Sequence, residues 1–336
     1  MSDPRESNFL GALMGMAIGD ALGAPVAGWD RLRIATEFGE LSTYQPVAGP
    51  EGEPDATGEF TDETEIALCL VESMTANRGL LDPETAGFRM LRLALGPSRR
   101  WMQSATSAAL DAAANSLVFQ VPIDEDGPAT GDVASRGVPI GLLHSIGALN
   151  ATRLRDDSER AARLTHGGPA AFNAVTAIAF ATRLAARGEP RDTWASETSA
   201  FLGGGQLAEQ LSALSSVRGE SDLSSQLEQF GTGLDATQSV TAALAISMHP
   251  ATFSEAVLSA VRAGGATDTI AAITGALVGA ADGIAAIPQS LIDGLKGRIY
   301  ISLAAPWFYK AARQYAGQLI DLRPVHGPRP QMPPRQ

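Results

Sequence analysis

Two short polar clusters lie far apart in this 336-residue sequence, each directly before a long apolar segment. The first is Thr61-Asp62-Glu63-Thr64, and the second is Gly264–Thr269, which contains Asp268. Carboxylates and hydroxyls gathered at two helix N-termini are hard oxygen ligands, which Mg²⁺ and Mn²⁺ prefer. Ala266 stands in the second cluster where a third acid could be. The sequence therefore indicates a place for metal chemistry that two distant segments must build together.

The segments that follow these clusters have the apolar pattern of helices. Residues 61–76 are expected to form a helix that Thr61 caps, with acids in the first turn where they interact favourably with the helix dipole. Residues 8–25 form an apolar helical segment that ends at Gly23 and Pro25, both of which are stop signals. We expect further helices at 83–95, 98–118, 137–150, 158–164, 168–187, 191–202, 206–214, 235–248, 253–263, 267–285, 289–296 and 299–318. No convincing alternating strand pattern is present, so the predicted fold class is all-α.

Three long connections separate these helical segments, at residues 36–60, 120–136 and 215–234. They are rich in Gly, Pro, Ser or acidic residues and lack periodicity, and loops of this length in a compact domain are often functional. No clear linker divides residues 8–322, so we predict a single domain over 1–322. The remaining residues 323–336 are rich in Pro, which predicts a disordered tail.

Composition excludes several classes of protein. The formal net charge is −12 and no basic stripe is apparent, which argues against nucleic-acid binding. The single cysteine, Cys69, lies in an apolar stretch and is expected to be a buried thiol. The N-terminus has no signal-like pattern, and no run approaches the ~20 apolar residues of a membrane span. We therefore expect a cytoplasmic protein without membrane contact; its oligomeric state is left open.

Five motifs occur in a fixed order between about residues 8 and 290: GALMGMAIGDALGAP, GEFTDETEIAL, RGVPIGL, LTHGGPAA and AVRAGGATDTIAAITGALVGA. Together they resemble the ADP-ribosylglycohydrolase family, the all-helical dinuclear-metal hydrolases related to the dinitrogenase-reductase-activating glycohydrolase. The resemblance covers nearly the whole chain. It implies a compact helical bundle that holds two divalent ions in a cleft at one end, and a small-molecule or ADP-ribosylated substrate.

The resemblance also implies roles for individual residues in the two clusters. Mg²⁺ or Mn²⁺ would orient ribose hydroxyls and activate a water for attack at the anomeric carbon. Asp62 and Glu63 would be the catalytic carboxylates, with Glu63 either a weak ligand or the base for the water. The alternative is that Thr61 and Thr267 simply cap their helices. The positions that match the metal-binding runs of the family are Thr61, Asp62, Glu63, Asp268 and Thr269.

The sequence departs from the family at three acidic positions. Ala27 stands where the family has a glutamate near the scissile bond, Glu63 replaces an aspartate, and Ala266 replaces another. The extra methylene of Glu63 moves its carboxylate by roughly an ångström, which the strict geometry of Mg²⁺ tolerates poorly. We therefore predict one bound ion rather than two.

Several residues outside the clusters match the substrate-binding part of the family. Gly131 and Asp132 lie in the loop that cradles a pyrophosphate, but Asp132 would repel a phosphate. Arg136 could contact a phosphate or carboxylate, or it could tie helices together. His166 precedes a helix; it could form only a local hydrogen bond, or, since the family places it near the site, it could contact the ligand. Trp29 could stack on a base or sugar or simply pack. Asp20 lies in an apolar stretch. It is either a hydrogen-bond acceptor for a neighbouring helix start or a residue that hydrogen-bonds to the metal ligands without contacting the metal.

Three functions are compatible with these residues. The first is a metal-assisted hydrolase that cleaves an N- or O-glycosidic bond of an ADP-ribosyl or related ribosyl compound. The second is an inactive family member that binds a small ligand or has a structural role, as the losses at Ala27 and Ala266 suggest. The third is an enzyme repurposed for a small metabolite without a pyrophosphate, which the acidic loop at 131–136 favours.

Overall fold

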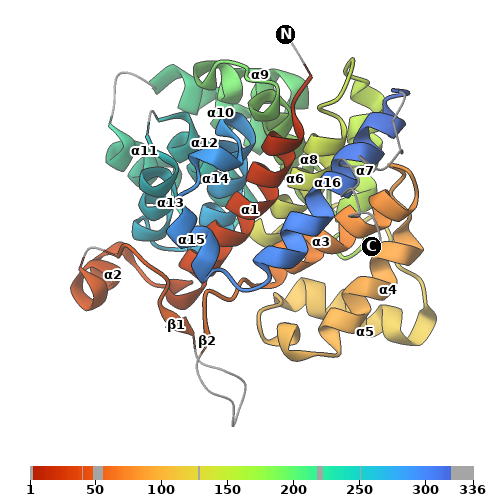
Figure 1. Cartoon of the computed structure of the whole chain (residues 1–336), viewed down its shortest axis with the longest axis horizontal. Coiled ribbons are helices and arrows are strands. Elements are labelled where there is room, and N and C mark those ends of the chain that lie inside the picture. Colours follow the sequence, from red (N-terminus) through yellow and green to blue (C-terminus); the bar gives the residue numbers. More distant parts are fainter. Residues whose placement is uncertain are drawn as a thin grey trace, which may run out of the picture.

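A computed structural model describes residues 3–39, 41–47, 56–127, 129–217, 222–249 and 251–318. The predicted tail at 323–336 lies outside these residues. The described part of the chain is helical apart from one small hairpin, which confirms the all-α prediction (Figure 1). Its α-helices are α1 (Glu6–Gly23), α2 (Arg31–Phe38), α3 (Asp62–Ala76), α4 (Pro83–Ala94), α5 (Ser104–Ser116), α6 (Gly137–Leu143), α7 (Ala151–Ala162), α8 (Pro169–Ala186), α9 (Trp194–Leu202), α10 (Gln206–Val217), α11 (Leu223–Phe230), α12 (Ala236–Met248), α13 (Phe253–Arg262), α14 (Thr267–Asp282), α15 (Gln289–Gly294) and α16 (Arg298–Tyr315).

Helices α1 and α14 pack against each other at the centre of the bundle (Figure 1). Glycines let their backbones approach: a Cβ atom on Gly15 would lie 2.2 Å from the carbonyl oxygen of Gly275. The same holds further along, where a Cβ atom on Gly11 would lie 2.3 Å from Gly279 O. The helices are antiparallel, so the end of α1 lies beside the start of α14. Because of this close packing, the second polar cluster, at the start of α14, lies next to the end of α1.

The structure differs from the sequence prediction mainly at the periphery. Helix α7 begins at residue 151, before the predicted 158, and α6 ends at 143, before the predicted 150. Helices α2 and α11 were not predicted, and α11 lies inside the segment expected to be a loop. Strands β1 (Pro46–Val47) and β2 (Ala56–Thr57) form an antiparallel pair within the long loop at 36–60. Each unpredicted element is short, with too few residues for a clear hydrophobic period.

The prediction that no stretch approaches a membrane span was wrong by length and composition. Residues Glu6–Val26 are long and apolar enough to cross a membrane. However, 89% of the most apolar window of this stretch is buried inside the bundle. Such burial is typical of a central helix in a globular protein that is surrounded by other helices.

Candidate functional site

Asp20, near the end of α1, positions the first polar cluster. Its carboxylate accepts hydrogen bonds from the backbone N–H of Thr61 at 3.0 Å and of Thr64 at 3.1 Å, and from Thr64 Oγ1 at 2.6 Å. Asp20 is completely buried, and this burial, together with the charge of Asp268, raises its pKa to about 7 although the hydrogen bonds oppose the shift. Asp20 is therefore an acceptor for a neighbouring helix start, one of the two roles that the sequence left open.

The first turn of α3 presents two buried carboxylates. Thr61 caps the helix, with Oγ1 accepting from the backbone N–H of Glu63 at 3.3 Å. Asp62 and Glu63 are 3% and 4% exposed, respectively. Asp62 Oδ2 and Glu63 Oε2 are buried and lack a hydrogen-bond partner among the described residues. Because an unpaired buried carboxylate oxygen is costly, these two atoms mark a place suited to a ligand.

The start of α14 brings the second cluster to the first. Ala266 occupies the N-cap position, and Thr267 lies one residue inside the helix with Oγ1 donating to Gly23 O at 2.8 Å. The alternative in which Thr267 caps this helix is therefore wrong. Thr269 Oγ1 donates to Glu63 Oε1 at 2.6 Å, and Asp268 Oδ1 accepts from the backbone N–H of Thr269 at 2.9 Å. Residues more than 200 positions apart thus share one site.

Asp132 adds a further buried carboxylate. It lies in the 3-10 helix η3 (Gly131–Arg136), where Oδ2 accepts from Thr106 Oγ1 at 3.0 Å and Oδ1 accepts from Thr130 Oγ1. Burial raises the pKa values of Asp62 and Glu63, and the negative charge of Asp132 adds to this effect. Nothing in the sequence indicated that Thr106 or Thr130 contacts the site, because both are far along the chain from the two clusters.

The predicted phosphate cradle is partly closed by the protein itself. The backbone N–H of Gly131 donates to Leu234 O at 2.8 Å, so it is not free to bind a phosphate. A Cβ atom on Gly131 would lie 2.4 Å from Ser239 Oγ, so this glycine makes room for packing. Together with the charge of Asp132 beside it, this arrangement disfavours a pyrophosphate at this loop.

Arg136 is a fully buried cation beneath the carboxylates. Its Nη1 donates to Ala161 O at 3.3 Å and to Ala162 O at 3.4 Å, which ties η3 to the end of α7. Burial lowers the pKa of Arg136, whereas the charges of Asp132, Asp62 and Glu63 raise it. These contacts match the helix-tying alternative, and the guanidinium also offsets part of the negative charge of the site.

His166 lies in the same buried region. Its Nδ1 is 2.8 Å from Thr165 Oγ1, and its Nε2 is buried without a hydrogen-bond partner among the described residues. Burial and the charge of Arg136 lower the pKa of His166 to about 4, against the opposing effect of Asp132. The imidazole is therefore neutral at pH 7 and has one ring nitrogen free for a ligand.

Trp29 lies at the edge of the second cluster, where its carbonyl oxygen accepts from the backbone N–H of Gly265 at 2.8 Å. Its ring is already occupied: Phe38 stacks on it at 5.9 Å between centroids, and the guanidinium of Arg33 lies 3.6 Å from its centre. These contacts match the packing alternative. Neighbouring Ala27 is exposed and places no acid near the cluster.

A nearby positive charge would stabilise the buried carboxylates of Asp62 and Glu63. Burial is the largest cause of the raised pKa values of Asp62 and Glu63, and repulsion from neighbouring acids adds to it. A hard divalent cation fits the two unpartnered oxygens and would relieve this repulsion. In the described part of the chain, however, no three His, Cys, Asp or Glu side chains converge as ligands for one ion. An ion here would also need threonine oxygens and water, as Mg²⁺ commonly keeps several waters.

Glu65 and Cys69 lie about one and two helical turns along α3 from Asp62. Both line a separate cavity, and burial raises the pKa of the Glu65 carboxyl despite a hydrogen bond from Ser98. Cys69 is buried, as the sequence predicts. Glu65 therefore does not replace the acids that the family would place at the metal site.

Comparison with known proteins agrees with the fold. The family model described as ADP-ribosylglycohydrolase matches residues 1–326. An uncharacterized protein of Archaeoglobus fulgidus is 31% identical over 91% of this chain and 97% of its own. The ADP-ribosylhydrolase ARH3 of Gallus gallus is 25% identical over 86% of this chain and 89% of its own. A solved structure titled ADP-ribosylglycohydrolase-related protein complex is 30% identical, covers 92% of this chain and 99% of its own, and has a TM-score of 0.69.

Proposed function

The chain belongs to the ADP-ribosylglycohydrolase family, and we propose that it is a metal-assisted hydrolase of an N- or O-glycosidic bond in an ADP-ribosyl or smaller ribosyl compound. The observation that carries the proposal is the pair of buried oxygens, Asp62 Oδ2 and Glu63 Oε2, which have no partner in the described part of the chain and lie near Asp268. A scaffold without a ligand would gain nothing from carboxylates that repel one another in a buried place.

One divalent ion, Mg²⁺ or Mn²⁺, fits this set better than two, because Ala266 contributes no carboxylate. Asp62 and Asp268 would hold the ion, with Thr61 and Thr269 nearby as neutral oxygen ligands. When bound, the ion supplies Lewis acidity and orients ribose hydroxyls. Arg136 and the hydrogen bonds to Asp20 and Asp132 keep the surrounding carboxylates in place.

Glu63 is suited to act as the base for the attacking water. Thr269 fixes one carboxylate oxygen, and the other has no partner among the described residues. Its raised pKa makes Glu63 a better proton acceptor than an exposed glutamate. In the proposed step the water oxygen bonds to the anomeric carbon while its proton moves to Glu63, and the glycosidic bond breaks with its electron pair passing to the leaving group. The leaving group takes a proton from solvent, and Glu63 then releases its proton to solvent. The neutral imidazole of His166 could hydrogen-bond the substrate through Nε2.

A second candidate is a hydrolase for a small ribosyl metabolite that has no pyrophosphate. The hydrogen bond from Gly131 to Leu234 and the charge of Asp132 support this choice, since both weaken phosphate binding at the loop. It uses the same carboxylates and differs only in the substrate.

The test is a hydrolysis assay with ADP-ribosyl-arginine, ADP-ribosyl-serine and simple ribosides, each with and without Mn²⁺. We expect Mn²⁺-dependent release of the ribosyl product from at least one substrate, and a loss of at least about a hundred-fold in Asp62→Asn. Glu65→Gln is the matched control, because Glu65 lies on the same helix but lines a separate cavity, and it should retain activity. If the native chain is inactive on all of them while Ala266→Asp with Ala27→Glu creates activity, the protein is an inactive member of its family.

A further inference from the structure

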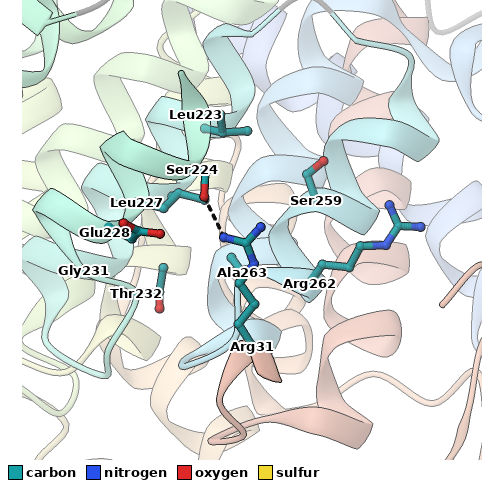
Figure 2. A pocket seen from close by; sticks show the side chains of 10 residues that line it. All are labelled: Arg31, Leu223, Ser224, Leu227, Glu228, Gly231, Thr232, Ser259, Arg262 and Ala263. Carbon is teal, nitrogen blue, oxygen red and sulfur yellow. Dashed lines mark hydrogen bonds between the residues drawn. The ribbon is translucent and has the colours of Figure 1, made fainter. Parts of the chain in front are cut away.

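A cavity of about 370 Å³ lies outside the carboxylate cluster, between α2, α11 and the end of α13. Its volume is within the roughly 300–1,000 Å³ of small-molecule sites. Figure 2 shows the residues that line it, and Arg31 rises from the first turn of α2 into the middle of the view. Leu223, Leu227 and Ala263 provide apolar wall.

Arg31 is the cation that this cavity offers to a ligand. Its Nη1 donates to Ser224 Oγ at 2.7 Å, which fixes the guanidinium from one side. The described residues form no other hydrogen bond and no ion pair with the Arg31 side chain. A guanidinium has five N–H donors, so most of them remain available. Arg262, the other arginine of the lining, turns away and donates to Leu41 O at 3.0 Å (Figure 2).

One hydroxyl group, that of Ser224, contacts the guanidinium, and Ser259 and Thr232 also line the cavity. Ser224 lies on α11 and Ser259 on α13, and in Figure 2 the Arg31 guanidinium lies between them. Thr232 lines the wall below. An arginine beside a serine hydroxyl can bind a carboxylate or a phosphate, because both groups donate hydrogen bonds to oxygen anions.

Two acidic side chains lie near the cavity and affect how much negative charge a ligand can carry. Glu228 on α11 also lines it, and the charge of Arg31 contributes to the lowered pKa of Asp222. The Asp222 carboxylate is engaged as the cap of α11, where it accepts from the backbone N–H of Ser225 at 2.8 Å. Glu228 is not engaged in this way by the described residues, so it should oppose an anionic ligand and favour a low total charge.

We propose that this cavity binds a small molecule through a carboxylate or phosphate group, with Arg31 as the recognising residue. The site is separate from the carboxylate cluster, and the proposal does not depend on hydrolase activity. The cavity nevertheless borders the loop that starts α14, because Thr232 O accepts from the backbone N–H of Ala266 at 2.8 Å. A ligand there would touch one of the segments that support Asp268.

The test is calorimetric titration of the full chain, in metal-free buffer, with inorganic phosphate and separately with acetate. Metal-free buffer ensures that the anion is not bound by a cation in the carboxylate cluster. We expect at least one probe to bind saturably with a Kd of about 1–10 mM, and Arg31→Gln to weaken it about ten-fold or more. Glu228→Gln should tighten binding about three-fold, because it removes a like charge.

Arg92→Gln is the matched control, since Arg92 lines a different cavity on α4 and should leave binding unchanged. Thermal unfolding checks that Arg31→Gln is folded, as its exposed side chain predicts. The proposal is overturned if neither probe binds below about 50 mM, or if Arg31→Gln binds as tightly as the native chain. Phosphate and acetate affinities, compared with each other, tell which anionic group the ligand carries.

Discussion

Thr269 Oγ1 donates a hydrogen bond of 2.6 Å to Glu63 Oε1 and so joins the two polar clusters across the site. This contact holds one oxygen of Glu63 and leaves Oε2 buried without a partner among the described residues. It also explains how the site accommodates a glutamate in place of the aspartate of the family. The longer side chain reaches across to α14, where it meets a hydroxyl rather than the carboxylate missing at Ala266.

The first prediction concerns this contact. Thr269→Val removes the hydroxyl at nearly constant volume, and we expect Mn²⁺ affinity to fall about ten-fold because Glu63 is no longer held and a hard oxygen is lost. Thr269→Ser keeps the hydroxyl and should stay within about three-fold of the native affinity. Calorimetric titration with Mn²⁺ measures both. Equal affinities in the valine and serine variants would show that the contact has no part in metal binding.

The second prediction concerns Asp20. Asp20→Asn replaces an oxygen that accepts from Thr61 and Thr64 with an NH₂ group facing N–H donors, and should lower the free energy of unfolding at pH 8 by about 2–3 kcal/mol. Asp222→Asn is the matched control, because asparagine is an equally good cap at the exposed start of α11 and should leave the free energy of unfolding nearly unchanged. Urea unfolding monitored by circular dichroism gives both values. Similar losses in the two variants would contradict a special role for Asp20.

The third prediction tests the close packing of α1 on α14. A Cβ atom on Gly15 would lie 2.2 Å from Gly275 O, which is backbone and cannot turn aside. Gly15→Ala should therefore destabilise the fold by about 3 kcal/mol or more. Gly204→Ala is the control, since a Cβ atom there has no neighbour within 4 Å. If both variants unfold at the same urea concentration as the native chain, the helices are further apart than described.

The fourth prediction concerns pH. The pKa of His166 is about 4 in the folded protein, below its ordinary value of 6.5. Between these values the unfolded chain binds a proton that the folded chain does not, so stability from this residue is present above pH 6.5 and is lost as pH falls toward 4. On going from pH 6.5 to pH 5, the native protein should lose about 2 kcal/mol more than His166→Gln. Parallel stability profiles for the two proteins would contradict the burial of a neutral imidazole.

Much of the fold was predictable from the sequence because its central helices are long and apolar. The helix at 61–76 was predicted with its Thr61 cap, since cap, first-turn acids and apolar face all agree there. Helix α11 was missed because its eight residues are surrounded by the Ser- and Gly-rich composition of a loop. The order of the five motifs predicted membership of the family. No single motif would have supported that prediction.

The site was predictable in part. The sequence pointed to Asp62, Glu63, Asp268 and Thr269, and the structure brings them together. The hydrogen bonds from Thr106 and Thr130 to Asp132 could not be predicted, because they depend on how three separate segments pack. Likewise, the engagement of the Gly131 N–H by Leu234 is a tertiary contact that a loop motif does not reveal.

The central claim is that the buried carboxylates on α3 and α14 bind a divalent cation. Calorimetric titration of the full chain with Mn²⁺ tests it most directly, with Asp62→Asn and the Glu65→Gln control titrated alongside. The account predicts saturable binding of about one ion per chain at micromolar or tighter Kd, lost in Asp62→Asn and kept in Glu65→Gln. No Mn²⁺ heat in the native protein, or native-like binding by Asp62→Asn, would contradict it.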